Sequence, residues 1–283
     1  MAASPSVQLY SVRDAISADL SGAVARIAAI GFTKVEPYAF VERVDEFEKA
    51  FAAAGVTAPS GHAPVIDSVD PARTFDAAAQ LGIGVVIDPF IPSERWQTAD
   101  DAARIADRVN ELQVAAAAAG LRFGYHNHNW EFSNLVDGRP IFELFLERIS
   151  AEVVLEIDTF WSTVGGADTP ALLRSLGERV QLLHIKDGTV AGDIASSLPS
   201  AESALLVPEA LEKAFRDQVP AGSGDVDIPA ILAAAPHALR VVEFDGYSGD
   251  IFEGVATSFA WLAENDTVGA TATATASDSA AVK

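Results

Sequence analysis

Short apolar runs alternate with longer segments of helical periodicity along most of the chain. The short runs are rich in β-branched and aromatic residues and predict strands at residues 7–11, 34–40, 58–65, 84–90, 122–130, 153–161, 180–187 and 239–247. Between them, apolar residues recur at helical spacing and predict helices at residues 20–30, 44–54, 71–81, 99–119, 140–149, 169–176, 228–235 and 254–265. Four of these helices are followed by a glycine that favours a left-handed helix end: Gly31, Gly55, Gly82 and Gly120.

This alternation of eight strand and helix units predicts an α/β fold of the (β/α)₈ TIM barrel type. Parallel strands need crossover helices, and a ring of such strands closes at eight. We therefore expect a single barrel domain over residues 6–265. A doubly wound open sheet is the competing architecture, but no Gly-x-Gly-x-x-Gly follows the first strand to indicate a dinucleotide-binding fold.

Two segments lie outside the repeating pattern. Residues 188–227 form a long excursion after the seventh predicted strand, and such loops at the C-terminal face of a barrel commonly form a wall or lid of the active site. Residues 266–283 are low in complexity and rich in Ala, Thr and Ser, so they have little to bury. We expect them to form a disordered C-terminal tail.

Composition and charge limit the class of partner. The chain has 283 residues, 49% of them hydrophobic, which is enough for a large core. Its 40 acidic and 19 basic residues give a net charge of −21, which repels nucleic acids and acidic membranes, so we expect a small-molecule substrate instead. The sequence contains no cysteine, no signal-peptide pattern at its start and no run of about 18 apolar residues. These features predict a cytoplasmic protein.

Four predicted strands in the second half end in residues that buried strands normally avoid. Side chains two apart on a strand share a face. This rule pairs His126 with His128, Glu156 with Asp158, His184 with Lys186, and Glu243 with Asp245. Carboxylates and imidazoles that converge in a semi-buried cluster need a cation to offset desolvation and mutual repulsion. The pattern therefore predicts a metal site with nitrogen and oxygen ligands, which suits Mn²⁺, Co²⁺, Mg²⁺, Zn²⁺ or Fe²⁺.

Seven motifs resemble the sugar phosphate isomerase/epimerase family, within the xylose-isomerase-like TIM barrels. They are Val-Gln-Leu-Tyr-Ser-Val-Arg (7–13), Gly-Phe-Thr-Lys-Val-Glu (31–36), Tyr-His-Asn-His (125–128), Glu-Ile-Asp-Thr-Phe-Trp (156–161), Leu-His-Ile-Lys-Asp (183–187), Gly-Ser-Gly-Asp-Val-Asp-Ile-Pro-Ala-Ile (222–231) and Val-Glu-Phe-Asp (242–245). The resemblance implies one divalent cation, bound by Glu, Asp, His and Glu from successive strand ends, and proton movement next to a sugar carbonyl. Asp158, His184 and Glu243 match three of these ligands, and Mn²⁺ is the ion that we expect first.

The fifth strand departs from that family pattern. Where related ketose epimerases carry a glutamate, this chain has His126, so we expect Glu156 as the fourth ligand, with His126 as the alternative. A histidine-rich fifth strand resembles inosose dehydratase and the eliminases that cleave 3-keto-glycosides. We therefore expect a lyase that carries out β-elimination on a 3-keto-sugar or 3-keto-glycoside. An isomerase or epimerase with the same enolate chemistry is the alternative, and a non-catalytic barrel subunit of a complex is the second alternative.

Further side chains are assigned to catalysis and to the sugar. His126 or His128 is the expected base, because neutral imidazole accepts protons near neutral pH, and Lys186 or the other histidine is the expected acid. Glu36 is expected to recognise a hydroxyl group or to transfer a proton. The equal alternative is a structural residue under a loop, whose carboxylate is satisfied by hydrogen bonds within the protein. The expected sugar-pocket residues are Gln8, Tyr10, Arg13, His62 and Trp161.

The remaining expectations concern the substrate and the assembly. Few basic residues lie near the later strand ends, which favours an unphosphorylated sugar. A DNA-repair endonuclease on this barrel is disfavoured because it needs a basic face. The fold alone favours a homo-oligomer. For Asp158, His184 and Glu243 the structural alternative is an ion-pair cluster at the barrel mouth, and for Glu156 it is a buried partner of an arginine or a histidine. For Lys186 the alternative is a pair with Asp187 or a nearby glutamate, and for Trp161 it is ordinary core packing.

Overall fold

Seven parallel strands form one curved sheet in the computed structural model, which describes residues 4–190 and 209–266. In ring order they are β1 (Ser6–Val7), β9 (Leu239–Val242), β8 (Val180–Ile185), β7 (Val154–Asp158), β4 (Arg122–His126), β3 (Val85–Asp88) and β2 (Ser60–His62). Residues 34–38 lie between β1 and β2 and bridge both sides through the parallel pairs Gln8–Glu36, Lys34–Thr57 and Tyr38–His62. The ring therefore closes through eight strand positions, and the predicted TIM barrel is confirmed.

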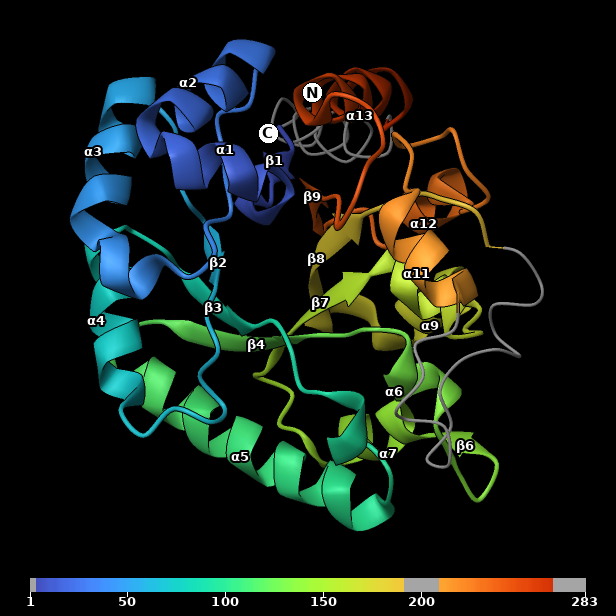
Figure 1. Cartoon of the computed structure of the whole chain (residues 1–283). Coiled ribbons are helices and arrows are strands. Elements are labelled where there is room, and N and C mark those ends of the chain that lie inside the picture. Colours follow the sequence, from blue (N-terminus) through green and yellow to red (C-terminus); the bar gives the residue numbers. More distant parts are fainter. Residues whose placement is uncertain (1–3, 191–208, 267–283) are drawn as a thin grey trace, which may run out of the picture.

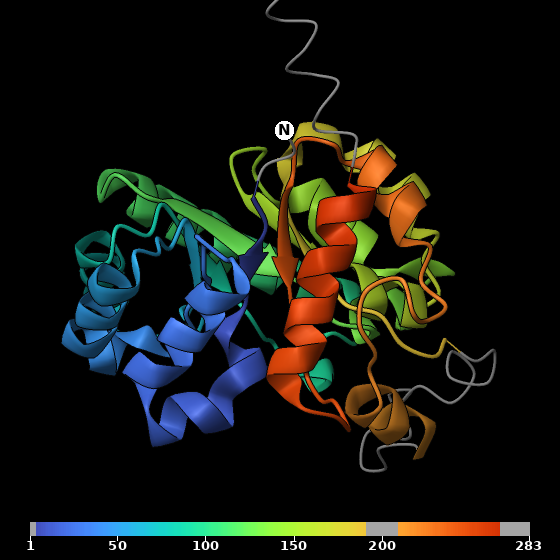
Figure 2. The same ribbon diagram turned by 90° about the horizontal axis from the view of Figure 1, so that it is seen from above.

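Helices surround the ring of strands (Figure 1). They are α1 (Arg13–Ala18), α2 (Leu20–Ile30), α3 (Val44–Ala54), α4 (Pro71–Gln80), α5 (Ala99–Ala118), α6 (Trp130–Ser133), α7 (Ile141–Arg148), α8 (Thr159–Val164), α9 (Thr169–Leu176), α11 (Glu209–Arg216), α12 (Ile228–Ala234) and α13 (Ile251–Asn265). Figure 2 shows α13 beside the N-terminal helices, and α13 contacts α2, so the last described helix packs against the second. No helix among the described residues combines the length and the apolar character needed to cross a membrane.

Smaller elements fill the loops. Within residues 4–190 and 209–266, four 3₁₀ helices occur at η1 (Leu9–Val12), η2 (Phe40–Arg43), η3 (Ser93–Arg95) and η4 (Gly177–Arg179). An antiparallel pair, β5 (Leu135–Val136) and β6 (Arg139–Pro140), forms a hairpin between α6 and α7. Together with α1, α6, α8 and α11, these elements were not predicted, because segments this short carry too little hydrophobic periodicity to be recognised.

The barrel interior changes from apolar to polar along the strands. A compact inner cluster, separate from the larger core between strands and helices, consists of Val85, Ile87, Val154, Leu182 and Val241. Gly124 lies against it, and a Cβ atom there would be 2.6 Å from the backbone oxygen of Val154, so only glycine leaves room. Two residues further along their strands, the next inward positions are Glu156, His184 and Glu243, because side chains two apart share a face. The apolar layer therefore forms the floor beneath a polar site.

Several predicted strands end earlier than their apolar runs. Asp158 ends β7 because its side chain accepts hydrogen bonds from the N–H groups of Phe160 and Trp161 and so begins α8. The Gln8 side chain likewise accepts a hydrogen bond of 3.1 Å from Tyr10 N–H at the start of η1. The predicted extension of these two strands to residues 161 and 11 is therefore wrong. In both places a capping side chain turns the chain out of the sheet.

The excursion and the tail are described only in part. Within the excursion, 188–227, the structure describes α11 and the segment after it, while residues 191–208 lie outside the described residues. Asp266 is buried and its carboxylate lies 2.8 Å from Arg240 Nε, so the packed part of the chain reaches this residue. The rest of the predicted tail, 267–283, lies outside the described residues.

Candidate metal centre and active site

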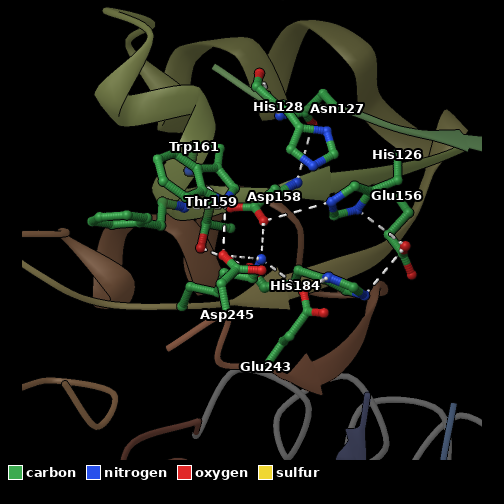
Figure 3. A network of polar contacts seen from close by, with 12 residues as sticks. His126, Asn127, His128, Glu156, Asp158, Thr159, Trp161, His184, Glu243 and Asp245 are labelled. Carbon is green, nitrogen blue, oxygen red and sulfur yellow. Dashed lines mark hydrogen bonds and ion pairs between the residues drawn. The ribbon is translucent and has the colours of Figure 1, made fainter. Parts of the chain in front are cut away.

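The strand ends bring the predicted metal and catalytic side chains into one polar cluster (Figure 3). His126 comes from β4, Glu156 and Asp158 from β7, and His184 from β8, while Glu243 directly follows β9. All five are buried. They meet because neighbouring strands of a barrel run parallel and direct alternate side chains inward.

Four of these residues form a group that is suited to a divalent cation. One ligand atom from each of His126, Asp158, His184 and Glu243 lies within 4.8 Å of the others, and we call this set the Asp158 group. His126 Nε2 is 3.6 Å from Asp158 Oδ2, and His184 Nδ1 is 2.5 Å from Glu243 Oε2. Ligands about 2.1 Å from one ion lie about 3 to 4 Å apart, so these side chains need little movement to share a cation.

A second group lies directly behind the first. It consists of His62, His126, Glu156 and His184, and we call it the Glu156 group. Glu156 Oε2 is 2.6 Å from His62 Nε2, 3.2 Å from His126 Nδ1 and 3.2 Å from His184 Nε2. The two groups share His126 and His184 but face opposite nitrogens of each ring. Glu156 was expected as the fourth ligand. Its carboxylate faces His126 Nδ1 and His184 Nε2, which are the ring nitrogens on the side away from the Asp158 group, whereas His126 Nε2 faces Asp158.

Glu36 joins the Glu156 group from the strand position at residues 34–38. Its Oε1 lies 2.8 Å from His184 Nε2 and accepts a hydrogen bond of 2.8 Å from Gln8 Nε2, and its Oε2 accepts one from Ser60. Burial raises the pKa of Glu36, and the negative charge of Glu156 raises it further. For Glu156, burial acts in the same direction, but the imidazoles of His184 and His62 outweigh it and hold its pKa well below the usual range. The two carboxylates therefore differ in their affinity for a proton.

Buried polar atoms without a hydrogen-bond partner occur in both groups. Among the described residues they include Asp158 Oδ2 in the Asp158 group and His126 Nδ1 and Glu156 Oε1 in the Glu156 group, and Lys186 Nζ lies 3.0 Å from Asp158 Oδ2. A buried carboxylate oxygen without a hydrogen bond is costly unless a cation compensates it. The mixed nitrogen and oxygen donor set also suits a divalent transition metal or Mg²⁺. The residues present therefore fit a divalent ion.

Lys186 supplies positive charge beside the same carboxylates. Its Nζ atom lies 3.0 Å from Asp158 Oδ2, 2.8 Å from Glu243 Oε2 and 2.8 Å from Asp245 Oδ2. Burial lowers the pKa of Lys186, but the three carboxylates outweigh burial and raise the pKa well above its usual value. Lys186 is therefore protonated. It does not pair with Asp187, whose carboxylate binds backbone N–H groups of the loop around residues 222–226.

His126, at the end of β4, and His128, just after it, are both neutral. Burial, followed by the charge of His184, lowers the pKa of His126 to about 3. Burial and the neighbouring His126 and Lys186 lower the pKa of His128 well below its usual value. The His128 ring stacks on Trp130 with a centroid distance of 4.5 Å and an interplanar angle of 5°. His128 is thus an oriented, neutral imidazole at the barrel mouth.

A cavity of about 350 Å³ opens above these groups. Its lining includes Tyr10, Tyr38, His62, His126, His128, Lys186, Glu243 and Asp245. The expected pocket residues Tyr10 and His62 therefore line it, together with all three expected acid–base side chains other than Glu36. A volume of this size is sufficient for a small ligand such as a monosaccharide.

The other expected sugar-pocket residues lie elsewhere. Gln8 is fully buried and its amide group holds Glu36. Arg13 donates hydrogen bonds to the carbonyl oxygens of Tyr10 and Asp245, and its guanidinium carbon is 4.5 Å from the centroid of the Tyr10 ring. Neither Gln8 nor Arg13 lines the cavity above the Asp158 group. Trp161 lines a neighbouring cavity of about 580 Å³, so it is not only a core residue.

Some residues of the site were missed from the sequence. Asp245 Oδ2 accepts hydrogen bonds from Lys186 Nζ (2.8 Å), Trp161 Nε1 (2.9 Å) and Gln218 Nε2 (2.9 Å). The period-two rule had placed Asp245 on the same face as Glu243, and the same rule applied to Glu36 would have found Tyr38. Nothing in the sequence pattern singles out Gln218, because it lies in an irregular loop.

Comparison with known proteins places the chain in a family. A family model described as xylose isomerase-like TIM barrel matches residues 24–247. No curated protein matches the sequence. The family match confirms the resemblance to xylose-isomerase-like barrels inferred from the motifs.

Solved structures with the same fold cover nearly the whole chain. A sugar phosphate isomerase/epimerase from Parabacteroides distasonis is 24% identical, with a TM-score of 0.70 over 92% of this chain and 94% of its own. A probable 3-DHS dehydratase from Bacillus anthracis is 12% identical, with a TM-score of 0.66 over 92% and 99%. The IolI protein with a bound zinc atom is 15% identical, with a TM-score of 0.62 over 93% and 96%. At these identities the likeness establishes the fold.

Proposed function

Since the chain belongs to the xylose isomerase-like TIM barrel family, we propose that it is a metal-dependent carbon–oxygen lyase acting on a 3-keto-sugar or 3-keto-glycoside. Neighbours in this fold are named as a sugar phosphate isomerase/epimerase and as a probable 3-DHS dehydratase, which supports an enzyme that acts on a small molecule of this kind. The observation that carries the proposal is that neutral His128 and protonated Lys186 line the same cavity. β-Elimination needs both a base and an acid.

The Asp158 group is the proposed metal site. His126, Asp158, His184 and Glu243 would hold one divalent ion, with Mn²⁺ as our first expectation and Zn²⁺, Co²⁺, Mg²⁺ and Fe²⁺ as alternatives. When bound, such an ion polarises the ketone oxygen and stabilises the negative charge of the enolate. His126 takes the place of Glu156 in this assignment because His126 Nε2 faces Asp158, whereas Glu156 faces the opposite sides of the rings.

The Glu156 group orients the ligands. Glu36 and Glu156 contact Nε2 of His184, and Glu156 faces Nδ1 of His126. A carboxylate that accepts the second ring N–H of a metal-binding histidine fixes its tautomer and makes the first nitrogen a better donor. Glu36, Glu156 and His62 are therefore proposed as positioning residues behind the metal site.

His128 is proposed as the base and Lys186 as the acid. The neutral imidazole of His128 accepts the proton from the carbon next to the ketone, and the resulting electron pair forms the C=C bond as the C–O bond on the next carbon breaks. Lys186 Nζ donates a proton to the departing oxygen. Exchange of both groups with solvent then restores their initial protonation states, so no oxidant or reductant is required.

The test is elimination observed directly. Purified protein with Mn²⁺ is incubated with 3-keto-glucosides and inosose in D₂O, and enone absorbance and products are followed by optical spectroscopy and NMR. We expect loss of the leaving group, abolished by EDTA and by His128→Ala. His237→Ala serves as a matched control, because His237 binds the carbonyl oxygen of Val180 near the start of β8, away from the site.

A sugar isomerase or epimerase is the second candidate. The same base can return its proton to the opposite face or to the neighbouring carbon, and one structural neighbour is named as a sugar phosphate isomerase/epimerase. Deuterium incorporation into a rearranged or epimerised ketose, without release of a leaving group, would replace the lyase by this activity.

A further inference from the structure

Two cavities meet at the mouth of the barrel. The inner cavity, of about 350 Å³, lies above the Asp158 group, and the outer cavity measures about 580 Å³. They share Phe90, His128, Phe215 and Asp245 as lining residues, so the two spaces adjoin along this wall. Each volume lies in the range of a small-molecule site. One monosaccharide above the metal group would therefore leave the outer cavity free.

The outer cavity is lined by aromatic side chains. They are Phe90, Trp130, Trp161 and Phe215. The Trp130 Nε1–H group donates a hydrogen bond of 3.1 Å to the carbonyl oxygen of Ile91, and the Trp161 Nε1–H group donates one of 2.9 Å to Asp245 Oδ2. Because both indole N–H groups have acceptors within the protein, these rings offer apolar surface to a ligand. The hydrogen bonds also hold the rings in place.

The aromatic rings near the shared wall are mutually oriented. Phe90 packs edge-on against Trp130, with a centroid distance of 5.5 Å and an interplanar angle of 84°. It also packs edge-on against His128, with a centroid distance of 5.3 Å and an interplanar angle of 89°. His128 stacks on Trp130. Such an array accepts a further flat ring by offset stacking or edge-to-face contact.

Two of the lining residues are exposed to an extent unusual for phenylalanine. Phe90 is 52% exposed and Phe215 is 43% exposed. Phe90 comes from the loop after β3 and Phe215 from α11, so distant parts of the chain place both rings at one cavity. Exposed apolar side chains that gather at a groove mark a binding site more often than a random surface. Glu212 and Arg216 add polar groups to the lining, which suits hydroxyl substituents on a ligand.

We propose that the substrate is a glycoside whose leaving group is a flat aromatic ring system, with the keto-sugar in the inner cavity and the aromatic group in the outer one. This inference rests on the proposed function and names its substrate class. His128 and Asp245 belong to both cavities, and Lys186 contacts Asp245, so the bond to be broken lies beside the proposed base and acid.

The chemistry of the leaving oxygen agrees with this placement. The base removes the proton on the carbon between the ketone and the anomeric carbon, a C=C bond forms, and the bond from the anomeric carbon to the aryl oxygen breaks. Lys186 Nζ transfers its proton to that oxygen. A phenol has a pKa of about 10, whereas an alkyl alcohol is a far weaker acid, so an aryl oxide departs with less help from a proton donor. An aryl oxide is therefore the better leaving group.

Binding of unreactive glucosides tests the aromatic site without turnover. Isothermal titration of the Mn²⁺-loaded protein compares phenyl, cyclohexyl and methyl β-D-glucoside. We expect the phenyl glucoside to bind at least about tenfold more tightly than the methyl glucoside, because it buries more apolar area. It should bind at least about threefold more tightly than the cyclohexyl glucoside, because only the phenyl ring makes ring–ring contacts. Phe215→Ala should weaken phenyl binding by about 3- to 10-fold. Leu135→Ala, another exposed apolar residue but in the β5–β6 hairpin, should leave phenyl binding unchanged.

The outcomes separate this inference from the proposed function. Equal binding of phenyl and cyclohexyl glucoside, no binding of either at millimolar concentration, or no effect of Phe215→Ala would overturn the aromatic site even if keto-glycosides are eliminated. A clear phenyl preference with no turnover of any keto-glycoside would instead retain the aromatic site and reject the lyase.

Discussion

Glu36 Oε1 lies 2.8 Å from His184 Nε2, although the two residues are 148 positions apart. Closure of the barrel produces this contact, because the strand position that holds Glu36 bridges β1 and so comes within reach of the later strands. The opposite nitrogen of His184 faces Glu243 at 2.5 Å. His184 is therefore held between a supporting carboxylate and a proposed metal ligand.

Removing the charge of Glu36 should weaken metal binding. In Glu36→Gln the side chain keeps its shape but no longer polarises the His184 ring, so we expect the Kd for Mn²⁺ to rise by about 10- to 100-fold. Isothermal titration measures this change, and circular dichroism checks the fold. Glu46→Gln is the matched control, since Glu46 is a surface residue that pairs with Arg43. An unchanged Kd in Glu36→Gln would exclude this positioning role.

The fourth ligand can be identified by comparing two variants. We expect His126→Asn to weaken Mn²⁺ binding by about 100-fold or more because it removes a ligand, and Glu156→Gln by about 10- to 100-fold because it removes only a partner of the ligands. Both are measured by titration of the metal into apo-protein. The opposite ranking would restore Glu156 as the ligand, as first expected from the sequence.

Lys186 should stabilise the metal-free protein more than the metal-loaded protein. Lys186→Met leaves three buried or nearly buried carboxylates without their cation, which we expect to lower the free energy of unfolding in EDTA by about 3 to 5 kcal/mol. Excess Mn²⁺ should recover part of this loss. Urea denaturation with EDTA and with Mn²⁺ provides the comparison. Lys213→Met, which breaks an exposed pair with Asp217, should cost about 1 kcal/mol or less.

Glu131 should make stability depend on pH. Burial raises the pKa of Glu131 to about 8, although Tyr125 O–H and His128 N–H both donate hydrogen bonds to its carboxyl group. Between its usual pKa and about 8, the unfolded chain releases a proton that the folded chain keeps, so rising pH favours unfolding. Over this range each increase of one pH unit lowers the free energy of unfolding by about 1.4 kcal/mol. We expect wild-type stability to fall from about pH 5 to about pH 8.

The matched variant for this effect is Glu131→Gln. Glutamine has the same shape and retains a donor and an acceptor for the two hydrogen bonds, but it does not titrate. The difference in unfolding free energy between variant and wild type should therefore grow with pH over the same range. Parallel profiles for the two proteins, measured by denaturant titration at several pH values, would show that Glu131 is ionised in the folded state.

The barrel and much of its polar mouth could be predicted from local pattern. Strand and helix alternation predicted the order of elements, and several helix ends agree with glycine and capping signals, as at Gly55 after α3. The period of two along β7 and β8 placed Glu156 with Asp158 and His184 with Lys186. Strand ends at Asp158 and Gln8 were not predicted, because the capping bonds of these side chains depend on where the chain turns out of the sheet.

The sequence by itself determined which side chains face the barrel interior, because inward orientation follows from alternation along each strand. The tertiary structure decided how they are combined: His126 stands with Asp158, Glu156 lies behind both shared rings, and Asp245 joins Lys186 to Trp161. The tertiary structure also formed the aromatic cavity, because it brings together Phe90 and Phe215 from distant segments of the chain. The reason is physical. Local pattern governs the direction of a side chain, whereas ring closure and the register between strands determine which atoms come within bonding distance.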